Sequence, residues 1–403
     1  MLISAIFIAM LLMICINIPI AVALAMCGVL GLLFTEGTSS LVTIALDMYD
    51  GSTKFSLIAI PMFVLAGAIM NAGGITDKLI NFVSAIIGFI RGGLAMVNIG
   101  VSLFFAEISG SAVADVAAMG SILIPQMKKR GYSKEFSAAV TSSSASLAII
   151  IPPSIPMILY AASANTSVEQ LFVAGIVPGL LGAGGLMLVA YLFAKHYDFP
   201  TEDAFNFPRL RETFVDALPA FTLPVIILGG IFGGFVTATE AAGLAVLASL
   251  VVSAWYGNLD RDHLRRAMLD GGIQTAVVML LVAASVLMGG FLTRAQIPQQ
   301  LAESILSITT QQWAILLILN FFFLVVGFFL HSAAAIILVI PIVIPLITAA
   351  GIDPVHFGLV VTLNLAIGQQ TPPVASVLIT ACSVARANIW EVSKVNIWFV
   401  GVL

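Results

Sequence analysis

The chain has 403 residues and a formal net charge of −4; hydrophobic residues make up 60% of it and charged residues only 9%. A mean hydropathy of +1.13 is far above that of a soluble domain, which excludes an ordinary soluble protein. The basic residues stand in short loops and form no stripe, which excludes nucleic acid as a partner. The three cysteines are scattered without metal-ligand spacing, so we interpret them as small buried apolar residues.

Apolar runs long enough to cross a bilayer as helices recur along the chain. Strict alternation of polar and apolar residues, the pattern of a membrane β-barrel, is lacking. Residues 1–33 have no basic leader and no small-residue cleavage site, so we expect a retained helix there and no signal peptide. Two amphipathic stretches, 77–91 and 298–307, are expected to lie flat at opposite membrane surfaces. Further membrane-crossing helices are predicted at 217–235, 241–256, 272–292 and 313–330.

A double proline inside an apolar stretch occurs twice. Pro152 and Pro153 recur as Pro372 and Pro373, 220 residues later in the same kind of setting. At the same offset two more pairs match, Pro125 with Pro345 and Gly131 with Gly351. Paired helix breaks at corresponding places in two halves of a membrane protein point to the substrate and ion sites of a transporter.

The basic loops predict the topology through the positive-inside rule. Clusters at 128–134, 195–211 and 261–266 are separated by pairs of crossings, so all three are expected in the cytoplasm. The loop 348–354 has no basic residue and faces outside if 272–292 crosses once and the next segment is a hairpin. The two halves are then inverted with respect to each other, the arrangement that exposes one site alternately to either side.

This topology divides the chain into two inverted repeats joined by a polar linker. The first repeat covers residues 1–197, with a hairpin at about 94–127 and a broken helix at about 136–164. The cytoplasmic linker covers residues 198–213. The second repeat covers residues 214–403, with a hairpin at about 313–346, a broken helix at about 355–385 and a final helix that looks truncated.

The first hairpin is expected to turn at Ser109, Gly110 and Ser111, with Asp115 one turn beyond. Irregular backbone at membrane depth persists only where it is buried in protein or lines a wet cavity, so chemistry is expected there. An ionisable residue at such depth is a functional candidate, although Asp115 could equally be tied to the backbone of the tip. The serine-glycine-serine turn has a plainer alternative as a small-residue packing contact.

The first broken helix is expected to unwind over 141–146, which includes Ser143, and 151–154. Each of Pro152 and Pro153 removes an amide donor, which frees carbonyl oxygens beside the hydroxyl of Ser154. Hydroxyl and carbonyl oxygens without a dedicated carboxylate suit a hard monovalent cation, and we predict sodium.

The second half offers equivalent residues. The hairpin turns at His331 and Ser332, and the break runs from Asn364 through Gly368, Gln369, Gln370, Thr371, Pro372 and Pro373. Half-helix N-termini after each break would present free amides to an anionic group of the substrate. Arg294 could pair with a substrate carboxylate, with an interface anchor as the alternative. His331 could be a ligand or, equally, a buried histidine bonded to a neighbouring helix.

Several motifs spread over nearly the whole chain: Ile108-Ser-Gly-Ser-Ala-Val-Ala-Asp115, Ile151-Pro-Pro-Ser154, Leu171-Phe-Val-Ala-Gly175 with Pro178-Gly179, Thr239-Glu-Ala-Ala242, Gly351-Ile-Asp-Pro354 and Thr371-Pro-Pro373. Together they resemble the large membrane subunit of tripartite ATP-independent periplasmic (TRAP) transporters. The resemblance implies an all-α, inverted-repeat, elevator-type transporter of the bacterial inner membrane that is driven by sodium. It also implies a small four-helix membrane subunit and a periplasmic binding protein as partners.

By the resemblance, at least two sodium ions would bind, one between each hairpin turn and the break of its own half. The implied sodium-binding residues are Ser109, Gly110, Ser111, Pro152, Pro153, Ser332, Gly368, Thr371 and Pro372. Substrate would meet Ser154, Arg294, His331, Gln369, Gln370 and Pro373, with Asp115, Ser143 and Asn364 as further functional candidates. Many relatives carry an acidic residue where His331 stands, which leaves the charge balance of the second site open. No small-subunit segment precedes Met1, so that partner is expected to be a separate chain.

The sequence thus predicts the transport subunit of a sodium-driven, binding-protein-dependent symporter that imports a sialic acid, a dicarboxylate or a sugar acid. The alternative is a binding-protein-independent sodium or proton antiporter of related architecture, which would need a transmembrane acidic pair. An intramembrane protease using Ser111 or Ser332 with His331 is disfavoured, because adjacent His and Ser on one helix point in different directions. No enzyme activity is predicted, and a purely structural scaffold would not need two matched helix breaks.

Overall fold

The structure is a computed structural model that describes residues 2–16, 18–199, 201, 204–372 and 374–403. Every regular element in these ranges is a helix. Nine helical stretches of the described residues are long and apolar enough to cross a membrane. The prediction of an all-α polytopic membrane protein is therefore confirmed.

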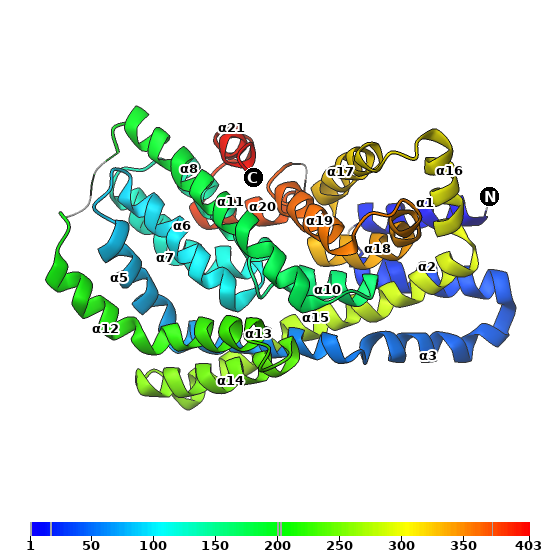
Figure 1. Ribbon diagram of the computed structural model, residues 1–403, viewed down its shortest axis with the longest axis horizontal. Helices are drawn as coiled ribbons and strands as arrows, with labels where there is room; N and C mark the ends of the chain where they lie inside the picture. Colours follow the sequence, from blue (N-terminus) through cyan, green and yellow to red (C-terminus); the bar gives the residue numbers. More distant parts are fainter. Residues whose placement is uncertain (1, 17, 200, 202–203, 373) are drawn as a thin grey trace.

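The N-terminal segment differs from the single retained helix that the sequence predicts. Pro19 lacks an amide hydrogen and stands at the start of a second helix, so the apolar run is divided in two. The first helices form one side of the molecule, with α3 and α4 lying end to end along its long axis (Figure 1). Their bounds are α1 (Leu2–Cys15), α2 (Ile20–Glu36), the 3-10 turn η1 (Gly37–Ser39), α3 (Ser40–Ser52), the 3-10 turn η2 (Phe55–Ile58) and α4 (Ala59–Ala72).

The next helices hold the first hairpin and the first broken helix. The amphipathic helix α5 follows Gly74, whose φ of 72° turns the chain out of α4. Unwinding in the broken helix is confined to residues 151–154; the serine run 141–146, where the sequence predicts unwinding too, stays helical up to Ala145. The bounds are α5 (Ile75–Ile87), α6 (Gly93–Ser109), α7 (Ala112–Lys129), α8 (Lys134–Ala145), α9 (Leu147–Ile150), α10 (Ile155–Ala164) and α11 (Val168–His196).

The predicted linker 198–213 is partly helical, because α12 already begins at Phe207. The side chain of Asn206 accepts a hydrogen bond from the amide of Arg209, and Pro208 stands in the first turn, so both residues favour a helix start at this point. The middle helices are α12 (Phe207–Pro224), the π-helical turn η3 (Val225–Gly229), α13 (Gly230–Phe232), α14 (Ala238–Trp255) and the long α15 (Arg261–Arg294).

The last helices hold the second hairpin and the second broken helix. The amphipathic α16 runs across the direction of α3 and α15 at one end of the molecule (Figure 1). The bounds are α16 (Ile297–Ile308), α17 (Gln312–Phe329), α18 (Ser332–Ala349), α19 (Pro354–Gly368), α20 (Ser376–Ala385) and α21 (Ile389–Val400).

Two packed groups of helices make up most of the molecule. The scaffold consists of α2, α3, α4, α14 and α15, with α15 packed along α2, α3 and α4. The hairpin body consists of α6 to α10 and α17 to α20, and it mixes the two halves of the chain, since α20 packs on α7 and α8 and α10 packs on α18. The broken helix 134–164 lies at its centre, with 94% of its apolar window buried. The first break is therefore enclosed by protein.

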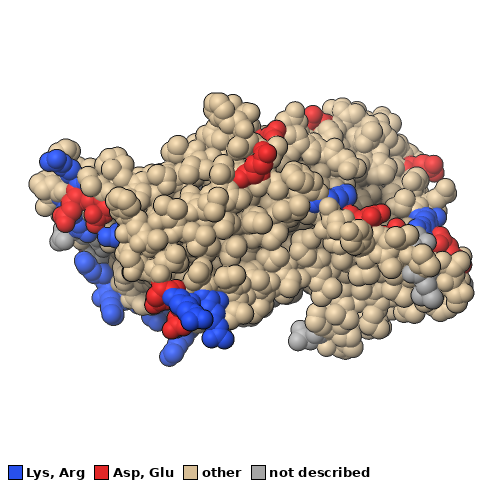
Figure 2. Space-filling model, turned by 90° about the horizontal axis from the view of Figure 1, so that it is seen from below, with Lys and Arg blue, Asp and Glu red and all other residues tan. Residues whose placement is uncertain are grey.

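Charge is distributed unevenly along the long axis. Most of the lysines and arginines visible in Figure 2 gather toward the end of the molecule where Figure 1 shows α5 and α12. A broad band next to them is nearly free of charged side chains on this face (Figure 2). This end holds the basic loops for which the positive-inside rule predicts a cytoplasmic location.

Candidate functional site

The tip of the first hairpin packs directly on the first helix break. Gly110 ends α6 with φ 58° and ψ 14°, a left-handed conformation that favours glycine. A Cβ at this position would lie 2.9 Å from the carbonyl oxygen of Pro153, and the amide of Ile155 donates to the carbonyl of Gly110 at 3.4 Å. The structure thus brings together the turn and the break that the sequence assigns to the first sodium site.

Ser154 joins the two sides of this break. Its hydroxyl donates to the carbonyl of Ile149 at 2.7 Å and accepts from the amide of Met157 at 3.3 Å. The side chain is fully buried, and it caps α10 while it holds the end of α9. The contact of Ser154 with substrate stays a prediction, and its hydroxyl already has two protein partners.

The second hairpin meets the second break in a similar way. The Nδ1 atom of His331 accepts a hydrogen bond from the amide of Ala333 at 3.4 Å, which caps α18. The amide of Val374 donates to the carbonyl of Phe328 at 3.2 Å, so the chain just after the break is held against the end of α17. Each hairpin therefore contacts the broken helix of its own half.

Both hairpin tips line one shared cavity of about 40 Å³. Tip residues Gly110 and Ser111 face it from the first half, and His331 and Ser332 from the second. The remaining described lining residues are Ala112, Ile149, Ile155, Pro156, Val278, Ala333 and Gln369. A water molecule needs about 10–15 Å³ by the same measure, so the cavity has room for a few waters or ions and no room for an organic acid.

The helix ends around this cavity carry opposite partial charges. The helices α7, α10 and α18 begin at it, through Ala112, Ile155 and Ser332, and their N-termini favour an anion. The chain leaves α9 and α19 at the same place, where Ile149 and Gln369 line the wall, and helix C-termini favour a cation. The site can thus attract a carboxylate and a cation side by side.

Gln370 links the second break to the first broken helix. Its side-chain amide donates to the carbonyl of Ser142 at 2.6 Å and also bonds the hydroxyl of Ser146. Asn396 of α21 donates to the carbonyl of Gln370 at 3.2 Å and accepts from the hydroxyl of Ser143 at 2.6 Å. These side chains are buried, so Gln370 and Ser143 belong to a hydrogen-bonded core network and do not line the cavity.

The same serine run bonds α6 on its other side. Asn98 donates to the hydroxyl of Thr141 at 2.6 Å, and Ser102 donates to the hydroxyl of Ser144 at 2.9 Å. These partners explain why 141–145 stays helical: the hydroxyls bond side chains of neighbouring helices or carbonyls of their own helix, and the backbone ladder is kept. Sequence reasoning missed Asn98, Ser102 and Asn396, although two polar residues one turn apart in an apolar helix are a usable signal.

Other predicted residues have local partners. The amide of Asn364 donates to Asn320 of α17 at 2.6 Å, and the hydroxyl of Thr371 donates to the carbonyl of Ile367 at 3.1 Å. Asp115 is buried in the first turn of α7, where the helix N-terminus stabilises a carboxylate. The side chain of Gln369 accepts from the hydroxyl of Ser376 at 3.1 Å, across the second break.

The remaining predicted positions lie beside the cavity or outside the described part. Pro152 and Pro372 belong to the breaks without lining the cavity; Gly368, which the sequence places in the second break, is the last residue of α19, because the helix continues through residues 364–368. Pro373 and the side chain of Ser109 lie outside the described residues.

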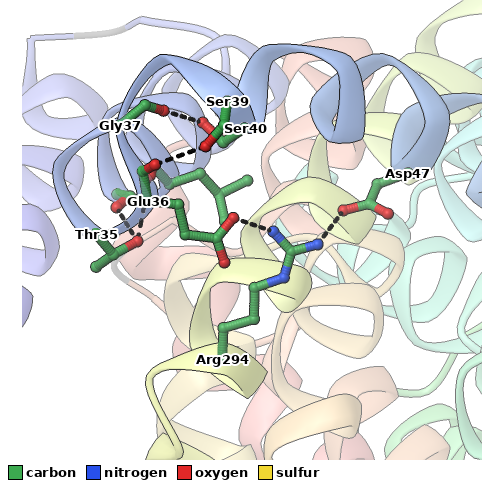
Figure 3. A network of polar contacts seen from close by, with 9 residues as sticks. Thr35, Glu36, Gly37, Ser39, Ser40, Asp47 and Arg294 are labelled. Atoms are coloured by element: carbon green, nitrogen blue, oxygen red, sulfur yellow. Dashed lines mark hydrogen bonds and ion pairs between the residues drawn. The ribbon is translucent and has the colours of Figure 1, made fainter.

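Arg294 lies away from the cavity and is held by two acids. Its guanidinium bonds Glu36 at the end of α2 at 3.0 Å and Asp47 of α3 at 3.2 Å (Figure 3). It is the last residue of α15, so the contacts join three scaffold helices at one point. The carboxylates that Arg294 meets in this structure are the protein's own.

Comparisons with known proteins identify the chain's relatives. The family model of the DctM component of the tripartite ATP-independent periplasmic transporter matches residues 7–403. The C4-dicarboxylate TRAP transporter large permease protein DctM of Vibrio cholerae is 34% identical and covers 100% of this chain and 94% of its own length. The sialic acid TRAP transporter large permease protein SiaM of the same organism is 36% identical, covering 90% and 85%.

A solved structure shares the fold. The YdaH transporter of Alcanivorax borkumensis superposes with a TM-score of 0.67 at 14% identity, over 92% of this chain and 87% of that one. The relatives are named as permease proteins and not as enzymes, in agreement with the sequence prediction. The chain therefore belongs to the DctM family, the large permease component of TRAP transporters.

Proposed function

We propose that the chain is the transport subunit of a sodium-driven symporter that imports a carboxylate-bearing organic acid delivered by a binding protein. The observation that carries the proposal is the single cavity in which two hairpin tips and two helix breaks meet. The relatives described above are named for a C4-dicarboxylate and a sialic acid. The solute class is therefore an organic acid such as a dicarboxylate, a sialic acid or a related sugar acid.

Sodium would bind at the oxygen atoms of the hairpin tips and helix breaks. Ser111 and Ser332, which carry hydroxyls, line the cavity next to the ends of α9 and α19. The described residues contain no group of three or more His, Cys, Asp or Glu side chains that could hold a metal ion, and uncharged oxygens suit a monovalent cation better than a divalent one. At least two sodium ions fit the presence of two breaks.

The size of the cavity supports an elevator motion. About 40 Å³ is too small for the solute, and a displacement of the hairpin body relative to the scaffold would admit it. Val278 of α15 is the scaffold residue in the cavity wall, so the cavity opens when the two groups of helices slide apart. Rigid displacement around a site at an inverted-repeat interface is the usual form of alternating access.

Sodium coupling would make uptake concentrative. Two sodium ions entering with a monovalent acid move a net charge of about one, and about 100 mV then supplies roughly 2.3 kcal/mol. This energy corresponds to about fiftyfold accumulation of the solute. The proposal includes the bacterial inner membrane as location, and a small four-helix membrane subunit and a periplasmic binding protein as partners.

The test is solute uptake into proteoliposomes that contain this chain and its small subunit. Radiolabelled succinate, N-acetylneuraminic acid and a keto-sugar acid are offered with the corresponding binding proteins outside, with an inward sodium gradient imposed or withheld. We expect uptake of one acid that requires both sodium and its binding protein. Uptake that follows a proton gradient alone, or that ignores the binding protein, would instead support the antiporter alternative.

Substitutions at two glycines test whether the first hairpin tip takes part in this uptake. Gly110→Ala places a Cβ 2.9 Å from the carbonyl of Pro153 and strains a positive φ, so we expect uptake to be lost. Gly184→Ala in α11 is the matched control, because no atom lies within 4 Å of its Cβ position. Equal activity of the two variants would show that the tip is not part of the transport site.

A further inference from the structure

A second cavity, of about 220 Å³, lies between the scaffold and the hairpin body. The scaffold contributes Gly51, Ser285 and Gly289, and the hairpin body contributes Ser163 and Pro341. One charged side chain lines it, that of Lys54, from the segment between α3 and α4. We call it the Lys54 cavity.

The Lys54 cavity continues the tip cavity along the same helices. The tip cavity is lined by Pro156 of α10, Ala333 of α18 and Val278 of α15. The Lys54 cavity is lined by the residues three or four positions further along the same helices, Leu159, Ile337 and Val282. Each step is about one helical turn, or roughly 5.4 Å. The two cavities are therefore successive chambers of one path between the same three helices.

The path leads away from the basic end of the molecule. The tip cavity lies at the start of α10, and the Lys54 cavity lies toward the end of this helix, where Ala162 and Ser163 line it. The chain enters α8 from the basic loop 128–134, so the end of α10 is on the opposite side. By the positive-inside rule this is the outer side, from which a binding protein would deliver a solute.

The amine of Lys54 donates to the carbonyl oxygen of Ala162 at 2.9 Å. That carbonyl belongs to the last turn of α10, whose partial negative charge favours a cation. The contact joins the scaffold to the hairpin body. A hydrogen bond from an ammonium group to a carboxylate is stronger than one to a neutral carbonyl. The carboxylate of an arriving organic acid can therefore replace the carbonyl oxygen of Ala162 as the partner of the Lys54 amine.

We propose that the Lys54 cavity is an outer subsite for the carboxylate of the transported acid, and that the Lys54 amine exchanges the carbonyl of Ala162 for this carboxylate. The inference rests on the proposed function and adds a residue and a location to it. Drug-sized ligands occupy about 300–1,000 Å³, so 220 Å³ suits a small acid or the carboxylate end of a larger one. The exchange also frees the end of α10 from the scaffold, so arrival of solute loosens the contact that opposes displacement.

The test uses the complete transporter in proteoliposomes with the acid that shows sodium-dependent uptake in the panel above. Lys54→Gln removes the charge, Lys54→Arg retains it, and Lys78→Gln is the matched control, since Lys78 pairs with Asp216 and lines neither cavity. We measure KM for the acid, inhibition by its neutral amide, and the sodium-induced shift in melting temperature. The shift reports folding and sodium binding independently of the solute.

We expect Lys54→Gln to raise KM at least about tenfold, as loss of a charged hydrogen bond would do, and to abolish the preference for the acid over its amide. Lys54→Arg keeps most of the preference, Lys78→Gln keeps KM within about twofold, and all variants keep the sodium-induced shift. An unchanged KM and preference in Lys54→Gln would overturn the subsite while wild-type uptake still supports the proposed function. Equal weakening for acid and amide would also overturn it, because Lys54 would then only fasten α10.

Discussion

Gly327 of α17 and Gly368 of α19 pack backbone against backbone. A Cβ built on Gly368 would lie 2.5 Å from the Cα of Gly327, and one built on Gly327 would lie 3.0 Å from the Cα of Gly368. The second hairpin can therefore approach the second break only with glycine on both sides. This contact positions His331 and Gln369, which line the same cavity from these two elements.

We expect Gly368→Ala to push α17 away from the break and to lower stability by roughly 1–3 kcal/mol, the usual effect of an overpacked core. Thermal unfolding of the purified protein measures the loss, and uptake should fall because the tip cavity changes shape. Gly243→Ala in α14 is the control, since its Cβ position has no neighbour within 4 Å. Similar melting temperatures of the two variants would contradict the close contact.

A second prediction concerns the stability that the buried network around Gln370 provides. Gln370→Ala removes the amide oxygen that accepts from the hydroxyl of Ser142 and the amide nitrogen that donates to the carbonyl of Ser142, and each buried group left unpaired costs about 1–3 kcal/mol. We expect a lower melting temperature at every sodium concentration. The exposed Gln299, in α16, provides the control substitution Gln299→Ala. A variant that loses solute binding with full stability would show that Gln370 contacts the solute.

The hydroxyls of the hairpin tips make a third prediction. Ser111→Ala and Ser332→Ala each remove the hydroxyl of a residue that lines the cavity, so the sodium concentration for half-maximal uptake should rise at least about fivefold, or roughly 1 kcal/mol. Ser304→Ala, on the exposed face of α16, should leave it unchanged. If sodium dependence is the same in all three variants, the ions bind elsewhere.

A fourth prediction concerns Arg294. Its observed role in scaffold ion pairs and the substrate-binding role suggested by the sequence have different consequences for a substitution. As a scaffold residue it is about one-third exposed, so its ion pairs contribute only about 0–1 kcal/mol. Arg294→Gln should then lower stability slightly, less so at high salt, and should leave KM within about twofold. A double-mutant cycle with Glu36→Gln isolates the pair. A large rise in KM without loss of stability would restore the carboxylate-binding role suggested by the sequence.

The helical breaks could be predicted because their causes are local. Pro152 restricts the backbone and Gly110 permits a left-handed turn wherever they stand, and basic loops orient the segments between them. The division of the N-terminal apolar run into two helices has the same kind of local cause, since Pro19 lacks an amide hydrogen.

The contacts of the site could not be predicted, because they depend on distant partners. The acids that hold Arg294 are 258 and 247 residues away in the chain. The serine run 141–146 resembles an unwound ion site until Asn98 and Asn396 are placed beside it. For the same reason the sequence does not reveal that the two hairpin tips, one from each half, line one cavity.

The Ile149–Ser154–Met157 contacts have a mechanical consequence. One hydroxyl fastens the end of α9 to the beginning of α10, so the irregular segment between them is braced and does not act as a hinge. In the proposed elevator motion the broken helix would then move as one rigid unit, with its carbonyls and amides at constant spacing. Such a motion would preserve ion affinity at both ends, and the change in access would arise at the surface where this unit passes α15.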